Sequence, residues 1–201
     1  DVVKFQIFKA ETLLTHDHPA FQIIKDNELP REWVGELATY AAQRNVLFTA
    51  SPFDHEAVDL LCEIGVPLLK WASPEIHDIP LLKYAAATGK ALLVSTGMCN
   101  LMDIHHAIEA VRSQGNENFA VLHCVSAYPT DTADINLRMM DSIRDAFRVP
   151  VGLSDHTTST VIPAAAVARG ACIIEKHFTL SRSLDGPDHS FALEPAELSA
   201  M

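Results

Sequence analysis

The chain of 201 residues has no long apolar run, little positive charge and few cysteines. No stretch approaches the roughly 20 apolar residues that a membrane-spanning helix needs, so we expect no membrane partner. Fifteen Lys and Arg against 26 Asp and Glu give a formal net charge of -11, which argues against nucleic acid as a partner because such binding needs an extended cationic surface. The four cysteines form no CxxC pair, and free thiols fit a reducing, cytoplasmic location.

Short apolar segments alternate with longer amphipathic ones, a rhythm typical of βα units. Seven segments are predicted as buried parallel strands: residues 2–8, 46–50, 67–72, 91–95, 120–125, 149–153 and 171–178. Candidate helices cover residues 33–44, 54–64, 79–88, 101–113 and 136–147, and Gly65, Gly89, Gly115 and Gly170 stand where helices should stop. We predict one α/β domain over residues 1–201, of either a (β/α)₈ TIM barrel lacking its first strand or an open doubly wound sheet.

Polar residues gather at the carboxyl ends of the predicted strands, where both architectures build their sites. Side chains two residues apart on a strand share a face. Each of the pairs Lys4/Gln6, Ser154/His156 and Glu175/His177 therefore points in one direction. For a single residue, capping of a strand or helix explains the pattern as well, but several ionisable groups at equivalent strand ends need a shared explanation.

His156 and His177 end consecutive predicted strands. Consecutive strands of a parallel sheet are typically neighbours about 4.8 Å apart, which lets two imidazoles hold one ion. Two imidazoles with further positions left to water or substrate favour manganese, zinc, iron or cobalt, and magnesium less. Asp155 should point to the opposite face and cap the following helix.

Two lysines, Lys4 and Lys70, could neutralise a phosphate or carboxylate in this acidic chain. Lys70 could instead form a Schiff base with a carbonyl substrate, as in class I aldolases, or a structural salt bridge. The other histidines are expected in loops or on helix surfaces, exposed to solvent. They are His16, His18, His55, His77, His105 and His106.

Ordered motifs along almost the whole chain resemble those of the N-acetylneuraminate (sialic acid) synthase family. They are Val3-Lys4-Phe5-Gln6, Phe8-Lys9-Ala10-Glu11, Ala50-Ser51-Pro52-Phe53-Asp54, Lys70-Trp71-Ala72-Ser73-Pro74-Glu75, Ser95-Thr96-Gly97-Met98, Leu122-His123-Cys124, Gly152-Leu153-Ser154-Asp155-His156-Thr157, Glu175-Lys176-His177-Phe178-Thr179 and Gly186-Pro187-Asp188-His189. Each motif alone is weak, but their order and spacing together are specific.

The resemblance implies a (β/α)₈ barrel enzyme that condenses phosphoenolpyruvate with N-acetylmannosamine or a related N-acetylated hexosamine and releases phosphate. It implies that His156 and His177 bind a divalent metal, usually Mn²⁺, with Mg²⁺ or Co²⁺ as alternatives. Glu175 would orient the site or move a proton. Positions that resemble the phosphoenolpyruvate site and its surroundings are Lys4, Gln6, Ser51, Lys70, Ser73, Ser126, Tyr128 and Ser154, and Asp188 resembles a residue that holds the acceptor sugar.

Departures from the family pattern concern the acceptor and the chain ends. Ser51 stands where threonine is common, Ser126 stands where some members have asparagine, and the segment 12–31 is shorter than usual. The chain is expected to lack the family's first strand, with its glutamate, and its C-terminal antifreeze-like domain; the complete protein would be a homodimer. Two alternative functions stay open: a Schiff-base aldolase or lyase using Lys70, and a catalytically silent sugar-binding barrel.

Overall fold

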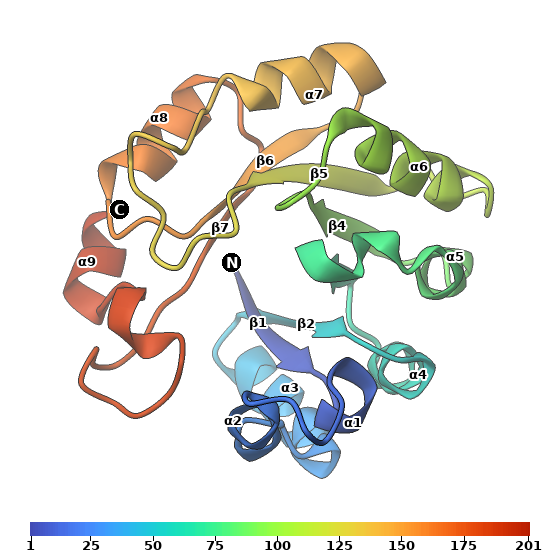
Figure 1. Cartoon of the computed structure of the whole chain (residues 1–201), viewed down its shortest axis with the longest axis vertical. Coiled ribbons are helices and arrows are strands. Elements are labelled where there is room, and N and C mark those ends of the chain that lie inside the picture. Colours follow the sequence, from blue (N-terminus) through green and yellow to red (C-terminus); the bar gives the residue numbers. More distant parts are fainter. The chain divides into compact units, whose positions relative to one another are not determined.

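The computed structural model describes all residues 1–201 and alternates strands with helices along the chain (Figure 1). It divides into two compact units. The first unit comprises Asp1–Leu93 and Ala107–Asn118, and the second comprises Val94–His106 and Phe119–Met201. No helix is long and apolar enough to cross a membrane.

The first unit contains the parallel pair β1 and β2 and the helices that follow them. Its elements are β1 Val2–Ile7, α1 Ala10–Leu13, α2 Phe21–Asp26, η1 Arg31–Trp33, α3 Val34–Gln43, β2 Leu47–Pro52, α4 His55–Ile64, β3 Leu68–Trp71, η2 Ser73–His77 and α5 Ile79–Ala87. The first residues of β4 (Ala91–Ser95) and the last of α6 (Leu101–Arg112) also belong to it. In this unit β3 neighbours β4.

The strand pair β1 and β2 has one apolar and one polar face. Lys4 is opposite Thr49 and Gln6 is opposite Ser51 in the parallel register. The alternate residues form the other face, where the rings of Phe5 and Phe48 stack at 5.5 Å. This alternation follows from the two-residue period of a strand, and it separates the core from a row of polar groups.

The second unit contains the end of β4, the start of α6, and three further strands with their helices. These are β5 Phe119–Cys124, α7 Met139–Phe147, β6 Val151–Asp155, α8 Val161–Ala168, β7 Ile174–Lys176, η3 His189–Phe191 and α9 Pro195–Ala200. The strands β4, β5, β6 and β7 are neighbours in chain order. Gly152 permits the close approach of β7, because a Cβ there would lie 2.5 Å from the carbonyl oxygen of Ile173.

The predicted strands are all present, and their order decides between the two predicted architectures. A doubly wound sheet reverses its strand order at a switch point, whereas here neighbours follow the chain order within each sheet. The glycines expected at helix ends all have positive φ, from 73° to 87°. The strand predicted over residues 46–50 extends further than expected: β2 runs through Pro52, and the next N–H, of Phe53, still donates to the Ile7 carbonyl at 3.2 Å.

Candidate functional site

The polar face of the first unit carries a buried hydroxyl without a partner. Ser51 is 1% exposed, and its Oγ makes no hydrogen bond. Two residues earlier on the same face, the Thr49 hydroxyl donates to the Leu68 carbonyl at 2.6 Å. A buried hydroxyl normally finds a partner, so Ser51 marks a place where a ligand oxygen would fit. Lys4 and Gln6, on the neighbouring strand of this face, are half-buried.

The end of β3 places a cation and a second serine in the same unit. Lys70 is 4% exposed, and its ammonium donates to the carbonyl of Trp71 at 3.1 Å. Ser73 is 6% exposed and begins η2 directly after the strand. A buried ammonium is costly unless oxygens surround it. The first unit thus holds the predicted residues Lys4, Gln6, Ser51, Lys70 and Ser73, which lie on or directly after three strands.

The second unit holds the other predicted residues, and two of its strands present them as cross-strand pairs. Ser154 is directly opposite Glu175 in the register of β6 and β7, and its hydroxyl donates to Glu175 Oε2 at 2.7 Å. Two residues further on the same face, the ring centroids of His156 and His177 are 5.4 Å apart. The predicted proximity of the two histidines is therefore present in the structure.

Aromatic rings surround this histidine pair. The Tyr128 ring lies 4.3 Å from His156 and 6.3 Å from His177. Phe191 of η3 lies 5.1 Å from His177 and 5.4 Å from Tyr128. Tyr128 was predicted and Phe191 was not, because an apolar residue 14 positions after His177 carries no sequence signal for a site. Ser126, also predicted, lies half-buried two residues before Tyr128.

Each histidine of the pair directs Nδ1 at an oxygen. His156 Nδ1 donates to the Val125 carbonyl at 2.8 Å, which leaves Nε2 as the lone-pair nitrogen of the neutral ring. His177 Nδ1 lies 3.6 Å from Asp188 Oδ2. The Val125 carbonyl at His156 Nδ1 is the kind of acceptor by which proteins orient an imidazole for metal binding through the other nitrogen, whereas the Asp188 carboxylate lies beyond hydrogen-bond distance of His177.

The local environment changes two pKa values in the cluster. Burial lowers the pKa of His156, but the Cys124 thiol, 3.9 Å from Nδ1, together with the Val125 carbonyl and Glu175, outweighs burial and raises it overall. Desolvation raises the pKa of Tyr128 to about 12, although 54% of the residue is exposed. Its hydroxyl therefore stays protonated at neutral pH.

The opposite face of β6 and β7 carries a buried ion pair. Asp155 Oδ2 and Lys176 Nζ are 2.6 Å apart, with side chains 0% and 4% exposed. The expectation that Asp155 points away from the histidines holds. The expectation that it caps the following helix is wrong: it accepts the N–H of Thr157 at 2.8 Å within the turn, and α8 begins only at Val161.

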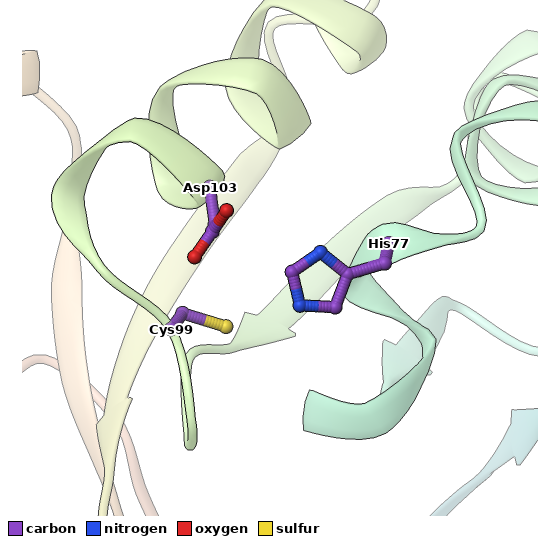
Figure 2. Close-up of side chains that lie close together, drawn as sticks. All are labelled: His77, Cys99 and Asp103. Carbon is purple, nitrogen blue, oxygen red and sulfur yellow. The ribbon is translucent and has the colours of Figure 1, made fainter.

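Other candidate residues have local structural partners. His123 lies opposite Leu153 in the register of β5 and β6, and its Nε2 donates to the Ile135 carbonyl at 2.7 Å. Figure 2 shows Cys99 just before α6 and Asp103 in the first turn of that helix, where Asp103 accepts the Asn100 N–H at 2.9 Å. His77, also labelled in Figure 2, is exposed at the end of η2. The six histidines predicted to be exposed are all exposed, and none of the four cysteines forms a disulfide.

The parallel strands in chain order, the alternating helices and the polar strand ends define an α/β protein of the TIM-barrel class. The chain belongs to the NeuB family, whose model matches residues 1–201. This confirms the resemblance that the motifs indicated.

Similar proteins of known name are acid synthases and a spore coat protein. The chain is 41% identical over 217 residues to N,N'-diacetyllegionaminic acid synthase of Campylobacter jejuni, a match that covers 100% of this chain and 65% of that protein. It is 37% identical to the spore coat polysaccharide biosynthesis protein SpsE of Bacillus subtilis, covering 100% of this chain and 57% of that protein. The chain thus spans about six-tenths of the length of these relatives.

Solved structures support the same fold. The N-acetylneuraminic acid (sialic acid) synthetase from Leptospira borgpetersenii, in complex with citrate, superposes with a TM-score of 0.94 at 36% identity and covers 99% of this chain and 70% of that one. A DAHP synthase from Thermotoga maritima superposes with a TM-score of 0.78 at 17% identity, which shows the fold alone.

Proposed function

We propose that the protein condenses phosphoenolpyruvate with an N-acetylated aldehyde hexosamine to give a nonulosonic (sialic-type) acid and phosphate, with the help of a divalent metal. Family membership over residues 1–201 supports this. Relatives named for N,N'-diacetyllegionaminic, pseudaminic and N-acetylneuraminate-9-phosphate products match at 37% to 41% identity. Since these names give different acid products, which would be made from different acceptors, we propose the class of acceptor and no single sugar.

The observation that carries the proposal is the pair His156 and His177 at 5.4 Å, each ring with its Nδ1 at an oxygen. This donor set fits a divalent metal, and it favours Mn²⁺ or Co²⁺ over Mg²⁺ because the ligands are imidazole nitrogens. Both rings would hold the ion through Nε2. When bound, such an ion acts as a Lewis acid on a carbonyl oxygen, here that of the aldehyde sugar.

The first unit supplies groups suited to the phosphate and carboxylate of phosphoenolpyruvate. Lys70 and Lys4 would neutralise these anions, and charge-assisted hydrogen bonds to an anion are the strong ones. Ser51, whose hydroxyl has no protein partner, would donate to a ligand oxygen, as would Ser73 and the amide of Gln6. These groups would hold phosphoenolpyruvate in one orientation for the reaction.

The reaction forms a bond between C3 of phosphoenolpyruvate and the aldehyde carbon, adds water at C2 and releases inorganic phosphate. A group that moves a proton must lie on the reacting face, and Glu175 lies there two residues before His177. The Ser154 hydroxyl holds one Glu175 oxygen at 2.7 Å and so orients the carboxylate. Asp188 would contact the acceptor sugar, and Ser126 and Tyr128 would line the site around the substrates. We also propose that the complete protein is a homodimer, as the family resemblance implies, and that it is cytoplasmic, as its free thiols suggest.

The test is release of phosphate from phosphoenolpyruvate by the complete protein, with and without Mn²⁺. The acceptor panel contains N-acetylmannosamine, its 6-phosphate and bacterial diacetamido-hexoses, with elemental analysis of the purified protein. We expect release that requires both the metal and one class of acceptor. No metal-dependent release with any acceptor would contradict the proposal.

Two further measurements separate the alternative functions. Borohydride trapping of pyruvate on the protein, abolished by Lys70→Ala, would support a Schiff-base aldolase or lyase instead. Calorimetry that finds binding of neither Mn²⁺ nor phosphoenolpyruvate would support a catalytically silent barrel.

A further inference from the structure

The short strand β7 is held to β6 by three side-chain pairs. The three residues of β7 lie opposite Leu153, Ser154 and Asp155 of β6. The three side-chain pairs are Ser154 with Glu175, Asp155 with Lys176, and His156 with His177. The hydrogen bond from Ser154 to Glu175 and the ring pair of His156 and His177 lie on one face. The ion pair of Asp155 and Lys176 lies between them in sequence and on the other face.

The Lys176 ammonium is the centre of a buried network that also fixes the turn after β6. Besides the Asp155 carboxylate at 2.6 Å, it donates to the Thr157 carbonyl and to the Ser159 carbonyl at 3.2 Å. The other Asp155 oxygen accepts the Thr157 N–H at 2.8 Å. One side chain of β7 thus binds both the end of β6 and the turn on the far side of His156.

A strand as short as β7 has little backbone pairing to set its register. A slip of one residue would exchange the two faces, placing Lys176 beside His156 and turning His177 away. Such a slip would also leave the buried Asp155 carboxylate without its cation, and an uncompensated buried charge is strongly destabilising. The ion pair therefore disfavours a one-residue slip of β7, which would separate the histidines.

We propose that Lys176 is a positioning residue: its buried ion pair with Asp155 fixes the register of β7 against β6 and thereby holds His156 and His177 face to face. The expected loss of metal affinity on removing the ion pair rests on the proposed function, whereas the expected loss of contact between the two histidine rings does not. Nothing in the network touches the reacting face directly, so the effect passes through the two histidines.

The experiment compares the complete wild-type protein with the double variant K176M/D155N, which removes both buried charges while Asn can still accept the Thr157 N–H. Removing both partners avoids the orphaned charge that a single substitution leaves. Mn²⁺ alone is titrated by electron paramagnetic resonance, and we expect roughly 10- to 100-fold weaker binding, the range for groups that orient metal ligands. The matched control is Ile143→Ala in α7, a core residue with 0% exposure.

Ile143 belongs to α7, which packs against β5 and β6, so the control lowers stability beside β6 but leaves the side-chain pairs between β6 and β7 unchanged. It should keep wild-type Mn²⁺ affinity while its melting temperature falls. Wild-type affinity in the double variant, or an equal loss in the control, would overturn the proposal. If the double variant does not fold, Asp155→Glu is measured in the same way, because it keeps both charges but lengthens one arm of the ion pair, and a roughly 3- to 10-fold loss is expected.

A second readout needs no metal. In histidine-labelled protein, the cross-ring nuclear Overhauser effect between His156 and His177 should be present in wild type and in Ile143→Ala and lost in the double variant. If wild type does not bind Mn²⁺, the metal part of the proposed function fails, and this ring contact still decides the role of Lys176. A ring contact retained in the double variant would contradict it.

Discussion

Two buried serines, one in each unit, show how the two groups of polar residues differ. Ser51 of β2 has no hydrogen-bond partner, whereas Ser154 of β6 donates to Glu175 at 2.7 Å. A buried hydroxyl without a partner costs about 1 to 3 kcal/mol of stability, which a ligand oxygen would recover. A bonded hydroxyl instead orients its partner. Ser51 thus offers its hydroxyl to an anion in the first unit, and Ser154 fixes a side chain in the second unit, where the Ser126 hydroxyl also lacks a partner.

The largest expected effect comes from breaking the histidine pair. His156→Ala should reduce metal-dependent phosphate release by about 1,000-fold, since a metal ion contributes several kcal/mol to the barrier, and should abolish Mn²⁺ binding. Steady-state assays and a Mn²⁺ titration measure these effects. His105→Ala, an exposed residue in the same unit, is the control and should behave like wild type. Full activity in His156→Ala would show that the pair binds no catalytic ion.

The next effect tests the cation of the first unit. Lys70→Met should raise the KM for phosphoenolpyruvate by roughly 10- to 100-fold, because a hydrogen bond to a charged group contributes about 1.5 to 3 kcal/mol. It should leave Mn²⁺ binding unchanged. Lys90→Met serves as the control, since Lys90 lies in the loop before β4 of the same unit. An unchanged KM would remove Lys70 from the anion site.

A smaller effect compares two hydroxyls on one strand. Ser51→Ala should leave the ligand-free protein as stable as wild type or more so, because it removes a buried hydroxyl without a partner, and should weaken phosphoenolpyruvate binding by roughly 3- to 10-fold. Thr49→Val removes a hydroxyl bonded to Leu68 at 2.6 Å, so it should cost about 1 kcal/mol of stability and leave binding intact. Thermal melts and calorimetry distinguish the two. If both variants behave alike, the contrast between these hydroxyls is wrong.

The smallest effect concerns the buried His123 of β5. Burial lowers its pKa below 6.5, opposed by its hydrogen bond to the Ile135 carbonyl. The unfolded chain therefore binds a proton more readily, so the stability contributed by neutral His123 is present above pH 6.5 and is lost as the pH falls through the folded pKa. His123→Gln, which can still donate to Ile135, should lose less stability than wild type between pH 7 and pH 5. The melting temperatures of wild type and variant are measured over this pH range. If both fall by the same amount, the prediction is wrong.

Residue patterns were sufficient to predict which segments form strands and which residues share a face. The pairs Lys4/Gln6, Ser154/His156 and Glu175/His177 follow from the two-residue period of a strand. Sequential pairing of β6 and β7 then brought the histidines together as predicted. The predicted strand boundaries were less accurate. The predicted strand 171–178 is a strand only at Ile174–Lys176, because the Ala171 N–H still donates to the Ala166 carbonyl at the end of α8.

The sequence by itself determined the order of strands and helices, the family and the identity of the polar residues at the strand ends, because these depend on local period and composition. Only the tertiary structure decided which atoms meet. The Val125 carbonyl at His156 Nδ1, the Phe191 ring beside His177 and the ion pair of Lys176 with Asp155 depend on strand register and loop path, which arise from packing between segments distant in the chain.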